Sequence, residues 1–371
     1  MKYYIIAGEA SGDLHGSNLM KNIFKHDSHA EIRFWGGDLM QQTGGTLVKH
    51  YRDLAFMGFA EVIMNLKTIL NNIKFCKADI LKFQPDVIIY IDYPGFNMRI
   101  AQWAKKIGLK NHYYISPQIW AWKESRIKAI KRDVDKMYVI LPFEKDFYEK
   151  KHNFPVAFVG HPLIDAIHNR PKTNPDFFKK ENGLDERPVI ALLPGSRKQE
   201  IAKMLSEMLA VMPDFPDYQF VIAGAPSQEF SFYQQFLTND QVHFISNKTY
   251  DLLGVAHAAL VTSGTATLET ALFKVPEVVL YKGNWISYQI AKRIITLKYI
   301  SLVNLIMDEE VVTELIQDDC NPKKIKTELK KLLDPTYRAN LLKKYDALET
   351  RLGGDGASEK TAQLIIAALK E

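Results

Sequence analysis

The sequence predicts an α/β protein made of two doubly wound parallel-sheet domains followed by C-terminal helices. Three observations predict this fold class. Short β-branched or aromatic runs alternate with longer amphipathic stretches through most of the chain, as in parallel sheets covered by helices on both faces. The runs fall into two series separated by a polar stretch, which indicates two sheets. From Asn321 onward apolar residues recur only at helical spacing, which predicts terminal helices.

The strand candidates are short, largely apolar runs, the pattern of strands buried on both faces. The first series consists of residues 3–8, 32–37, 86–92, 112–117, 137–143 and 156–160. The second series consists of residues 189–195, 220–226, 242–246, 258–264 and 277–283. Right-handed crossovers between these runs give two open sheets, each with its ligand edge at the carboxyl ends of the strands.

A polar stretch at 168–188 contains Pro, Asn and charged residues but no strand signal, which indicates a linker with a short helix. We therefore predict an N-terminal domain at 1–165 and a C-terminal domain at 166–345. The remaining segment, 346–371, is predicted to be a helix and is a candidate to pack back on the first domain.

Composition excludes several classes of function. The 371 residues carry a net charge of +5, with no aromatic-studded basic stripe, so we expect no nucleic-acid partner. The chain begins on a strand pattern and has no run of about 18 apolar residues, so we expect neither a secretory signal nor a membrane span. Cys76 and Cys320 are far apart without a nearby His cluster, which is typical of reduced thiols in a cytoplasmic protein.

No metal site is expected. Asp133 and Asp135 match the spacing of a metal-binding Asp-x-Asp pair, but they precede a strand candidate instead of following one. His15, His112 and His161 are scattered without ligand spacing.

The turn after the first strand candidate reads GEASGD. Ser11 is placed to cap the helix that follows, Asp13 falls in its first turn, and Gly12 permits close approach. Free amides at such a helix start suit an anion, but a plain strand-to-helix turn explains the pattern equally well. Because the turn is not GxGxxG, a dinucleotide cofactor is disfavoured.

Two further stretches of the first half could face a ligand. Asp92 follows the run DVIIYI and should emerge at the carboxyl edge of the sheet, where it is either a general base or, more commonly, a turn residue. Trp120 and Trp122 follow the next strand candidate, near Lys123 and Arg126. This group predicts either a wall that contacts sugar or acyl groups or a tryptophan pair packed in the core.

In the second half, the turns PGSR and SGT each join a strand candidate to a helix. Their candidate ligand-binding residues are Gly195, Ser196, Arg197, Ser263, Gly264, Thr265 and Glu269. Two helix N-termini, one with an arginine, suit a diphosphate, and Glu269 could accept hydrogen bonds from ribose hydroxyls. Every doubly wound sheet has several such turns, so an ordinary structural role stays open.

Residues 56–83 and 285–306 combine broad apolar stripes with scattered lysines. Such segments either lie at a membrane interface or form core helices of α/β domains, and the pattern alone favours the core.

The motifs AGEASGD, MGFAEVI, IDYPGFN, YISPQIWAW, LPFE, FVGHPL, LLPGSRKQEI, SGTATLE and YISLVNL stand in the order found in lipid-A-disaccharide synthases. The chain resembles that family from Gly8 to about Pro322. PGSR is shared with other nucleotide-sugar enzymes, whereas GEASGD together with SPQIWAW and SLVNL is highly specific. The resemblance implies a GT-B fold, in which two Rossmann-like domains face a cleft, with the acceptor on the first, UDP on the second, and no metal or other cofactor.

The activity implied by the resemblance is an inverting transfer of 2,3-diacylglucosamine from its UDP donor to the 6-hydroxyl of 2,3-diacylglucosamine 1-phosphate. The products are the β-1,6-linked lipid A disaccharide 1-phosphate and UDP. The lipid substrates imply a peripheral protein on the cytoplasmic face of the inner membrane, with residues 56–83 partly interfacial, and a homodimer stays open. The alternatives are another GT-B transferase or epimerase that uses UDP-N-acetylglucosamine, and a sensor that only binds a nucleotide sugar.

The family pattern also implies residue roles, with Asp92 as the general base. It assigns UDP and donor binding to Arg197, Ser196, Gly195, Ser263, Gly264, Thr265, Glu269 and Asn304. It assigns the acceptor or cleft to Glu9, Ser11, Gly12, Asp13, Trp120 and His161. The family loop often reads IDxPDFN, whereas Gly95 stands here at the second acidic place, which weakens any mechanism that needs a second carboxylate there.

Overall fold

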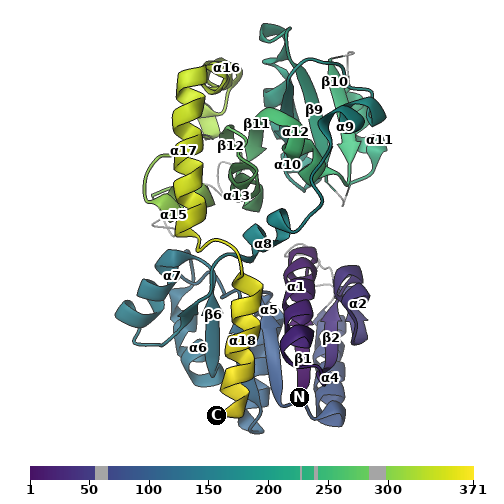
Figure 1. Cartoon of the computed structure of the whole chain (residues 1–371), viewed down its shortest axis with the longest axis vertical. Helices are drawn as coiled ribbons and strands as arrows, with labels where there is room; N and C mark the ends of the chain where they lie inside the picture. The colour runs from purple at the N-terminus through teal and green to yellow at the C-terminus, as the bar shows by residue number, and fades with distance from the viewer. Residues whose placement is uncertain (55–65, 226–227, 238–240, 284–297) are drawn as a thin grey trace. The chain divides into compact units, whose positions relative to one another are not determined.

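The computed structural model describes residues 1–54, 66–225, 228–237, 241–283 and 298–371. It divides the chain into two compact units, Met1–Asn169 with Leu352–Glu371 and Arg170–Arg351. Each unit holds one parallel sheet with helices packed against it (Figure 1), which confirms the predicted fold class. The first domain was predicted to end at 165, whereas the first unit extends to Asn169. The C-terminal segment was predicted to begin at 346, whereas the part that joins the first unit begins at Leu352.

The first unit contains seven parallel strands in the order β3-β2-β1-β4-β5-β6-β7. They are β1 (Lys2–Ala7), β2 (Glu31–Gly36), β3 (Thr46–His50), β4 (Val87–Ile91), β5 (Lys110–Tyr114), β6 (Lys136–Val139) and β7 (Ala157–Phe158). Strand β3 was not predicted from the sequence, because this edge strand is exposed or half-exposed along its length and has no apolar run. The order reverses between β1 and β4, which is the point where ligands of such sheets bind.

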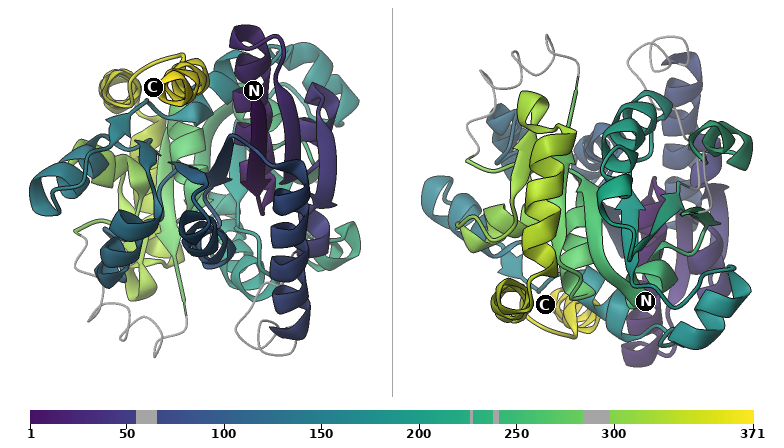
Figure 2. Two further views of the ribbon diagram at one scale, coloured as in Figure 1. Left: turned by 90° about the horizontal axis from the view of Figure 1, so that it is seen from below. Right: turned by 90° about the horizontal axis from the view of Figure 1, so that it is seen from above.

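Helices cover both faces of this sheet. One group consists of α1 (Ala10–His26), α2 (Asp38–Thr43), α8 (Pro162–His168) and α18 (Ala357–Lys370), in which α1 contacts the other three. The other consists of α4 (Leu66–Phe83), α5 (Pro94–Lys106) and α6 (Ile127–Asp133), in which α5 contacts both neighbours. Figure 2 shows α18 and α4 on opposite sides of the sheet. The short helix α7 (Pro142–Asp146) follows β6.

The last helix belongs to the first unit although it follows the second unit in the chain. Asp165 in α8 accepts hydrogen bonds from the backbone N–H groups of Gly356 at 2.7 Å and Ser358 at 2.9 Å, and so caps α18. α18 then lies along α1 (Figure 1) and buries Ile365 and Ile366. These contacts fasten the C-terminal segment to the N-terminal sheet.

The second unit contains six parallel strands in the order β10-β9-β8-β11-β12-β13. They are β8 (Val189–Leu193), β9 (Gln219–Gly224), β10 (Val242–Ser246), β11 (Ala256–Thr262), β12 (Glu277–Tyr281) and β13 (Glu314–Ile316). The order reverses between β8 and β11. The sequence missed β13, because three residues are too few to show a strand period.

The helices of the second unit are α9 (Pro175–Glu181), α10 (Lys198–Leu209), α11 (Phe230–Tyr233), α12 (Thr249–Val255), α13 (Thr265–Leu272), α15 (Leu302–Met307), α16 (Pro322–Leu333) and α17 (Pro335–Arg351). α9 is the short helix expected in the polar stretch 168–188. No helix in the described part of the chain has the length and apolar character needed to cross a membrane. The apolar segments 56–83 and 285–306 lie partly outside the described residues. Cys76 and Cys320 are buried free thiols.

Candidate active site

The carboxyl ends of β1 and β4 form the edge that carries the first candidate site. Ala7 at the end of β1 pairs with Ile91 at the end of β4, so the turns that follow emerge next to each other. A Cβ atom at Gly8 would lie 2.3 Å from the Tyr93 ring. The first glycine of GEASGD is therefore required by the contact between the two turns.

Asp92 lies in a strained turn that buried donors hold in place. Asp92 and Tyr93 adopt left-handed backbone conformations, with φ of 45° and 49°, which cost a non-glycine residue on the order of 1–3 kcal/mol each. Asn97 Nδ2 donates to the Asp92 carbonyl oxygen at 2.7 Å, and the Tyr113 hydroxyl donates to the same oxygen at 2.6 Å. Strain that is maintained by surrounding structure is typical of functional positions.

The carboxyl group of Asp92 has the proton affinity of a general base. Burial, and after it the nearby negative charge of Glu9, raise its pKa to about 6, against the opposing effect of a hydrogen bond from the backbone N–H of Tyr93. At neutral pH the group is therefore mostly ionised and still basic enough to take a proton from a hydroxyl in a transition state.

The structure corrects the predicted start of the first helix. α1 begins at Ala10 with Glu9 as its N-cap, so Ser11 lies in the first turn and does not cap the helix. The carboxylate of Glu9 at this helix start disfavours an anion there, so of the two interpretations left open for this turn the plain strand-to-helix turn fits better. Glu9 and Ser11 are exposed, whereas Gly12 and Asp13 are buried, so only the first two are available to a ligand.

Asp13 supports the fold. Its carboxylate accepts hydrogen bonds from the backbone N–H groups of Gly37 at 2.7 Å, Leu39 at 3.0 Å and Met40 at 3.0 Å. These bonds satisfy the first turn of α2, whose positive end also favours a carboxylate. The acidic residue of GEASGD thus joins α1 to α2.

We expect Asp13→Asn to lower the free energy of unfolding by about 2 kcal/mol, because a charged acceptor of buried N–H groups is lost. The KM values for both substrates should stay unchanged. Urea denaturation and steady-state kinetics measure the two effects. Asp38→Asn, at the exposed first position of α2, is the control; its carboxylate forms surface ion pairs with His50 and Arg52, so the change should alter stability by less than about 1 kcal/mol. A raised acceptor KM without a loss of stability would contradict the structural role.

The loop after β5 is organised by Glu144, a residue that the sequence analysis did not single out. Glu144 is buried. Its Oε1 accepts hydrogen bonds from Ser116 Oγ at 2.6 Å and from Trp120 Nε1 at 3.2 Å. Its Oε2 accepts a hydrogen bond from the backbone N–H of Leu141 at 2.8 Å. Burial raises the pKa of Glu144, and these hydrogen bonds oppose the rise. The sequence feature that could have identified Glu144 is its position as the third residue of α7, where a glutamate completes a capping box. Trp120 is therefore half-buried, with its indole N–H occupied.

His161 lies inside the first unit. It is the N-cap of α8, and its Nδ1 accepts from the backbone N–H of Leu163 at 3.2 Å. Burial, and after it the neighbouring His15, lower the pKa of His161 to about 3. The ring is thus neutral and fixes the start of α8, which follows the carboxyl end of β7.

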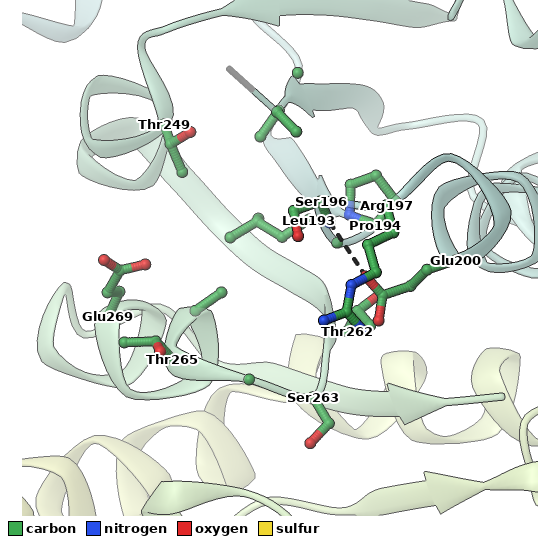
Figure 3. A pocket seen from close by; sticks show the side chains of 16 residues that line it. Leu193, Pro194, Ser196, Arg197, Glu200, Thr249, Thr262, Ser263, Thr265 and Glu269 are labelled. Atoms are coloured by element: carbon green, nitrogen blue, oxygen red, sulfur yellow. Dashed lines mark hydrogen bonds between the residues drawn. The ribbon is translucent and has the colours of Figure 1, made fainter. Parts of the chain in front are cut away.

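The second candidate site is a pocket of about 470 Å³ at the carboxyl ends of β8 and β11 (Figure 3). Small-molecule sites usually enclose about 300–1,000 Å³ and lie at this switch point of a doubly wound sheet. The lining includes the predicted residues Gly195, Ser196, Arg197, Ser263, Gly264, Thr265 and Glu269. The turns PGSR and SGT therefore meet in one pocket.

The PGSR turn is shaped by Glu200, which the sequence analysis also missed. Gly195 has φ of +102°, and a Cβ atom there would lie 2.2 Å from Glu200 Oε2. The same oxygen accepts from the backbone N–H of Ser196 at 3.2 Å (Figure 3). Arg197 follows as the exposed N-cap of α10, with its side chain at the pocket. Glu200 stands at the third helical position, where acidic residues commonly hold the preceding turn.

The opposite wall of the pocket is the start of α13. Gly264 is its N-cap and Thr265 its first residue, so the first-turn N–H groups lack intrahelical partners and form a positive end. Burial raises the pKa of Glu269, and the hydroxyl of Tyr250, which donates to Oε1 at 2.7 Å, lowers it. The pocket thus has a positively polarised end, which suits an anion, and a positioned carboxylate.

Asn304 lies behind the pocket and does not line it. It is buried, and its Nδ2 donates to the Val312 carbonyl oxygen at 2.8 Å and to Glu314 Oε1 at 2.9 Å. Glu314 also accepts from the backbone N–H of Ile300, whose carbonyl oxygen accepts from the Ser263 hydroxyl at 3.2 Å. Asn304 therefore positions the segment that supports the SGT turn, and Ser263 contributes its backbone to the lining while its hydroxyl is engaged.

The described residues contain no cluster of three or more His, Cys, Asp or Glu side chains that could hold a metal ion. Asp133, at the end of α6, pairs with Arg132, and Asp135 accepts from the backbone N–H of Asn111 at 2.8 Å.

Comparisons with known proteins identify the family to which the chain belongs. A model of the lipid-A-disaccharide synthetase family matches residues 3–367. Lipid-A-disaccharide synthases of Coxiella burnetii and Geobacter sulfurreducens are similar, with 37% identity over 97% of this chain and 96% of the relative, and 38% over 98% and 96%.

Two solved structures share the fold at 14% sequence identity. The UDP-GlcNAc 2-epimerase from Neisseria meningitidis bound to UDP-GlcNAc has a TM-score of 0.68 and covers 100% of both chains. The glycotransferase of kitacinnamycin has a TM-score of 0.67 and covers 99% of both. The epimerase likeness extends to the fold alone, whereas the family match covers almost the whole sequence. The chain therefore belongs to the lipid-A-disaccharide synthase family of glycosyltransferases.

Proposed function

We propose that the protein transfers 2,3-diacylglucosamine from its UDP donor to the 6-hydroxyl of 2,3-diacylglucosamine 1-phosphate, with inversion at the anomeric carbon. The products are the β-1,6-linked disaccharide 1-phosphate and UDP. This proposal is supported above all by the environment of Asp92. Burial is the main cause that raises the pKa of its carboxyl group to about 6, and a strained turn holds the residue at the carboxyl edge of the first sheet.

Asp92 acts as the general base. It removes the proton of the acceptor 6-hydroxyl while that oxygen attacks the anomeric carbon of the donor from the face opposite UDP. The bond from the acceptor oxygen to the anomeric carbon forms as the bond from that carbon to the diphosphate oxygen breaks. Gly95 is exposed, and a side chain there would meet nothing within 4 Å, so the second negative charge near Asp92 comes from Glu9.

UDP occupies the pocket of the second unit. Arg197 and the first-turn amides of α13 bind the diphosphate and stabilise the charge that develops as it leaves. Glu269 accepts hydrogen bonds from the ribose hydroxyls, and Tyr250 keeps its carboxylate in place.

The acyl chains of both substrates make the protein peripheral to the inner face of the inner membrane. In its described part, α4 exposes Leu70, Phe75 and Leu81, with relative accessibilities of 46%, 49% and 56%. Exposed apolar side chains on a lysine-rich helix are typical of an interfacial segment.

Product analysis tests this function directly. Mass spectrometry should detect the disaccharide 1-phosphate only when both lipid substrates are present, and proton NMR should show a β-linkage. Conversion of UDP-N-acetylglucosamine to its 2-epimer would favour the epimerase alternative. UDP binding without any product would favour a sensor.

We expect Glu9→Gln to shift the acidic limb of the kcat/KM profile to lower pH. Loss of the negative charge of Glu9 favours the ionised form of Asp92 and so lowers the pKa of Asp92. Initial rates measured across the acidic range give the shift. Glu31→Gln, at the opposite end of the sheet, should leave the limb in place; an unmoved limb in Glu9→Gln would remove Asp92 as the titrating base.

A further inference from the structure

The segment between β5 and α6 carries an exposed tryptophan near two cations. Trp122 has a relative accessibility of 49%. Lys123 Nζ lies 4.2 Å from the centroid of its ring, and the Arg126 guanidinium carbon lies 5.7 Å from the same centroid. An exposed indole held between two positive side chains presents an aromatic face and two sets of hydrogen-bond donors to solvent.

Within the described part of the chain, neither cation is paired with a carboxylate. Glu124, the acidic residue between them, pairs instead with Lys151 at 2.7 Å and His152 at 3.0 Å. No carboxylate in the described ranges forms an ion pair with Lys123 or Arg126. This positive group is therefore ready to accept an anion without first breaking an internal salt bridge.

The loop that carries the group is supported by buried contacts and hydrogen bonds. Lys123 is held in the left-handed conformation, with φ of 57°. Ile119 is buried, and the Tyr148 hydroxyl donates to the Pro117 carbonyl oxygen at 3.2 Å. Glu144 fixes the loop through its bonds to Ser116 and Trp120, as described above. A binding group on such a supported loop loses little conformational entropy when it binds its ligand.

The group lies at the same edge as the general base. β5 is the neighbour of β4 in the sheet. The positive charge of Arg126 is close enough to lower the pKa of Tyr113, although burial, the largest influence, and other groups raise it. The Tyr113 hydroxyl in turn donates to the Asp92 carbonyl oxygen at 2.6 Å.

We propose that Trp122, Lys123 and Arg126 bind the anomeric phosphate of the acceptor sugar. This assignment rests on the proposed function, because the acceptor there is a sugar phosphate. A phosphate monoester carries a charge of about −1.5 to −2 near neutral pH, and a planar guanidinium with a nearby ammonium matches its oxygens. The phosphate lies at one end of the acceptor ring and the reacting 6-hydroxyl at the other, so one edge with a cationic group and a carboxylate can hold both.

The test compares the acceptor with and without its phosphate, in neutral detergent micelles. Lys123→Gln and Arg126→Gln should each raise the KM for the phosphorylated acceptor about 10- to 100-fold, because a hydrogen bond to a charged group is lost. Donor KM should stay unchanged, and turnover of the dephosphorylated acceptor should be equal in wild type and variants. Arg126→Lys should recover part of the loss. Lys128→Gln, an exposed lysine on the next helix, is the matched control and should behave as wild type.

Two results would overturn the proposal while leaving the disaccharide activity intact. One is an equal loss on both acceptors, and the other is a wild-type enzyme that does not distinguish them. A second arm measures sedimentation with phosphatidylcholine vesicles that contain or lack phosphatidylglycerol. If the variants lose only their binding to the anionic vesicles, the phosphate that this group recognises is a lipid headgroup, and the acceptor assignment is wrong. Absence of any disaccharide from the wild-type protein would overturn the proposed function and this inference together.

Discussion

Asp92→Asn is expected to lower kcat by about 10²–10⁴, the usual cost of losing a positioned general base. The substitution keeps the size of the side chain, and asparagine tolerates the left-handed conformation that this position requires, with φ of 45°. The strained turn and its bonds from Asn97 and Tyr113 should therefore persist. Single-turnover assays with saturating substrates measure the chemical step.

Asp86→Asn is the matched control for this prediction. Asp86 precedes the same strand at the opposite end of the sheet, where its carboxylate accepts from the backbone N–H of Lys2 at 2.7 Å. It should retain wild-type kcat. Isothermal titration should show unchanged UDP binding in both variants. An Asp92→Asn protein that folds, binds UDP and turns over at the wild-type rate would disprove the assignment of the base.

Arg197→Gln is expected to lower kcat/KM for the donor by about 10²–10³, because it removes a positive group from the place where negative charge develops on the diphosphate. Arg197 is exposed at the N-cap of α10 and lines the pocket. Its loss should therefore affect the donor and leave the fold intact. Donor titrations with the acceptor held constant measure the effect, and UDP binding should weaken as well.

Arg187→Gln serves as the control, since Arg187 lies before β8 at the far end of the same strand and pairs with Asp185 at 2.7 Å. Half-exposed ion pairs of this kind contribute little to stability, so both kinetics and folding should stay close to wild type. If Arg197→Gln changed the acceptor KM and not the donor KM, the pocket would not be the UDP site.

The sequence predicted the parts of the fold and site that local patterns determine. Asp92 follows an apolar run, and the ends of parallel strands share an edge, so its position could be inferred without coordinates. The same rule brought PGSR and SGT into one pocket. β3 and β13 were missed, because a half-exposed strand and a strand of three residues lack a readable period.

Long-range hydrogen bonds account for most of the other differences between the predicted and the observed roles of individual residues. Asp13 and Asn304 belong to motifs that also contain candidate ligand-binding residues. The side chain of each, however, forms hydrogen bonds with backbone groups of another segment. Glu144 and Glu200 were overlooked for the converse reason. Each stands in the first turn of a helix of ordinary appearance, and its hydrogen bonds to the neighbouring loop are seen only in the structure.

The docking of α18 on α1 has a consequence for biosynthesis. Domains usually fold in the order in which they leave the ribosome, but the first unit here receives Ala357–Lys370 only after the whole second unit has been made. Until then, the side of α1 that α18 covers stays exposed, and Asp165 has no helix to cap. The amino-terminal half of the nascent chain is therefore the last to become complete, and during that interval it presents an apolar surface of the kind that chaperones bind.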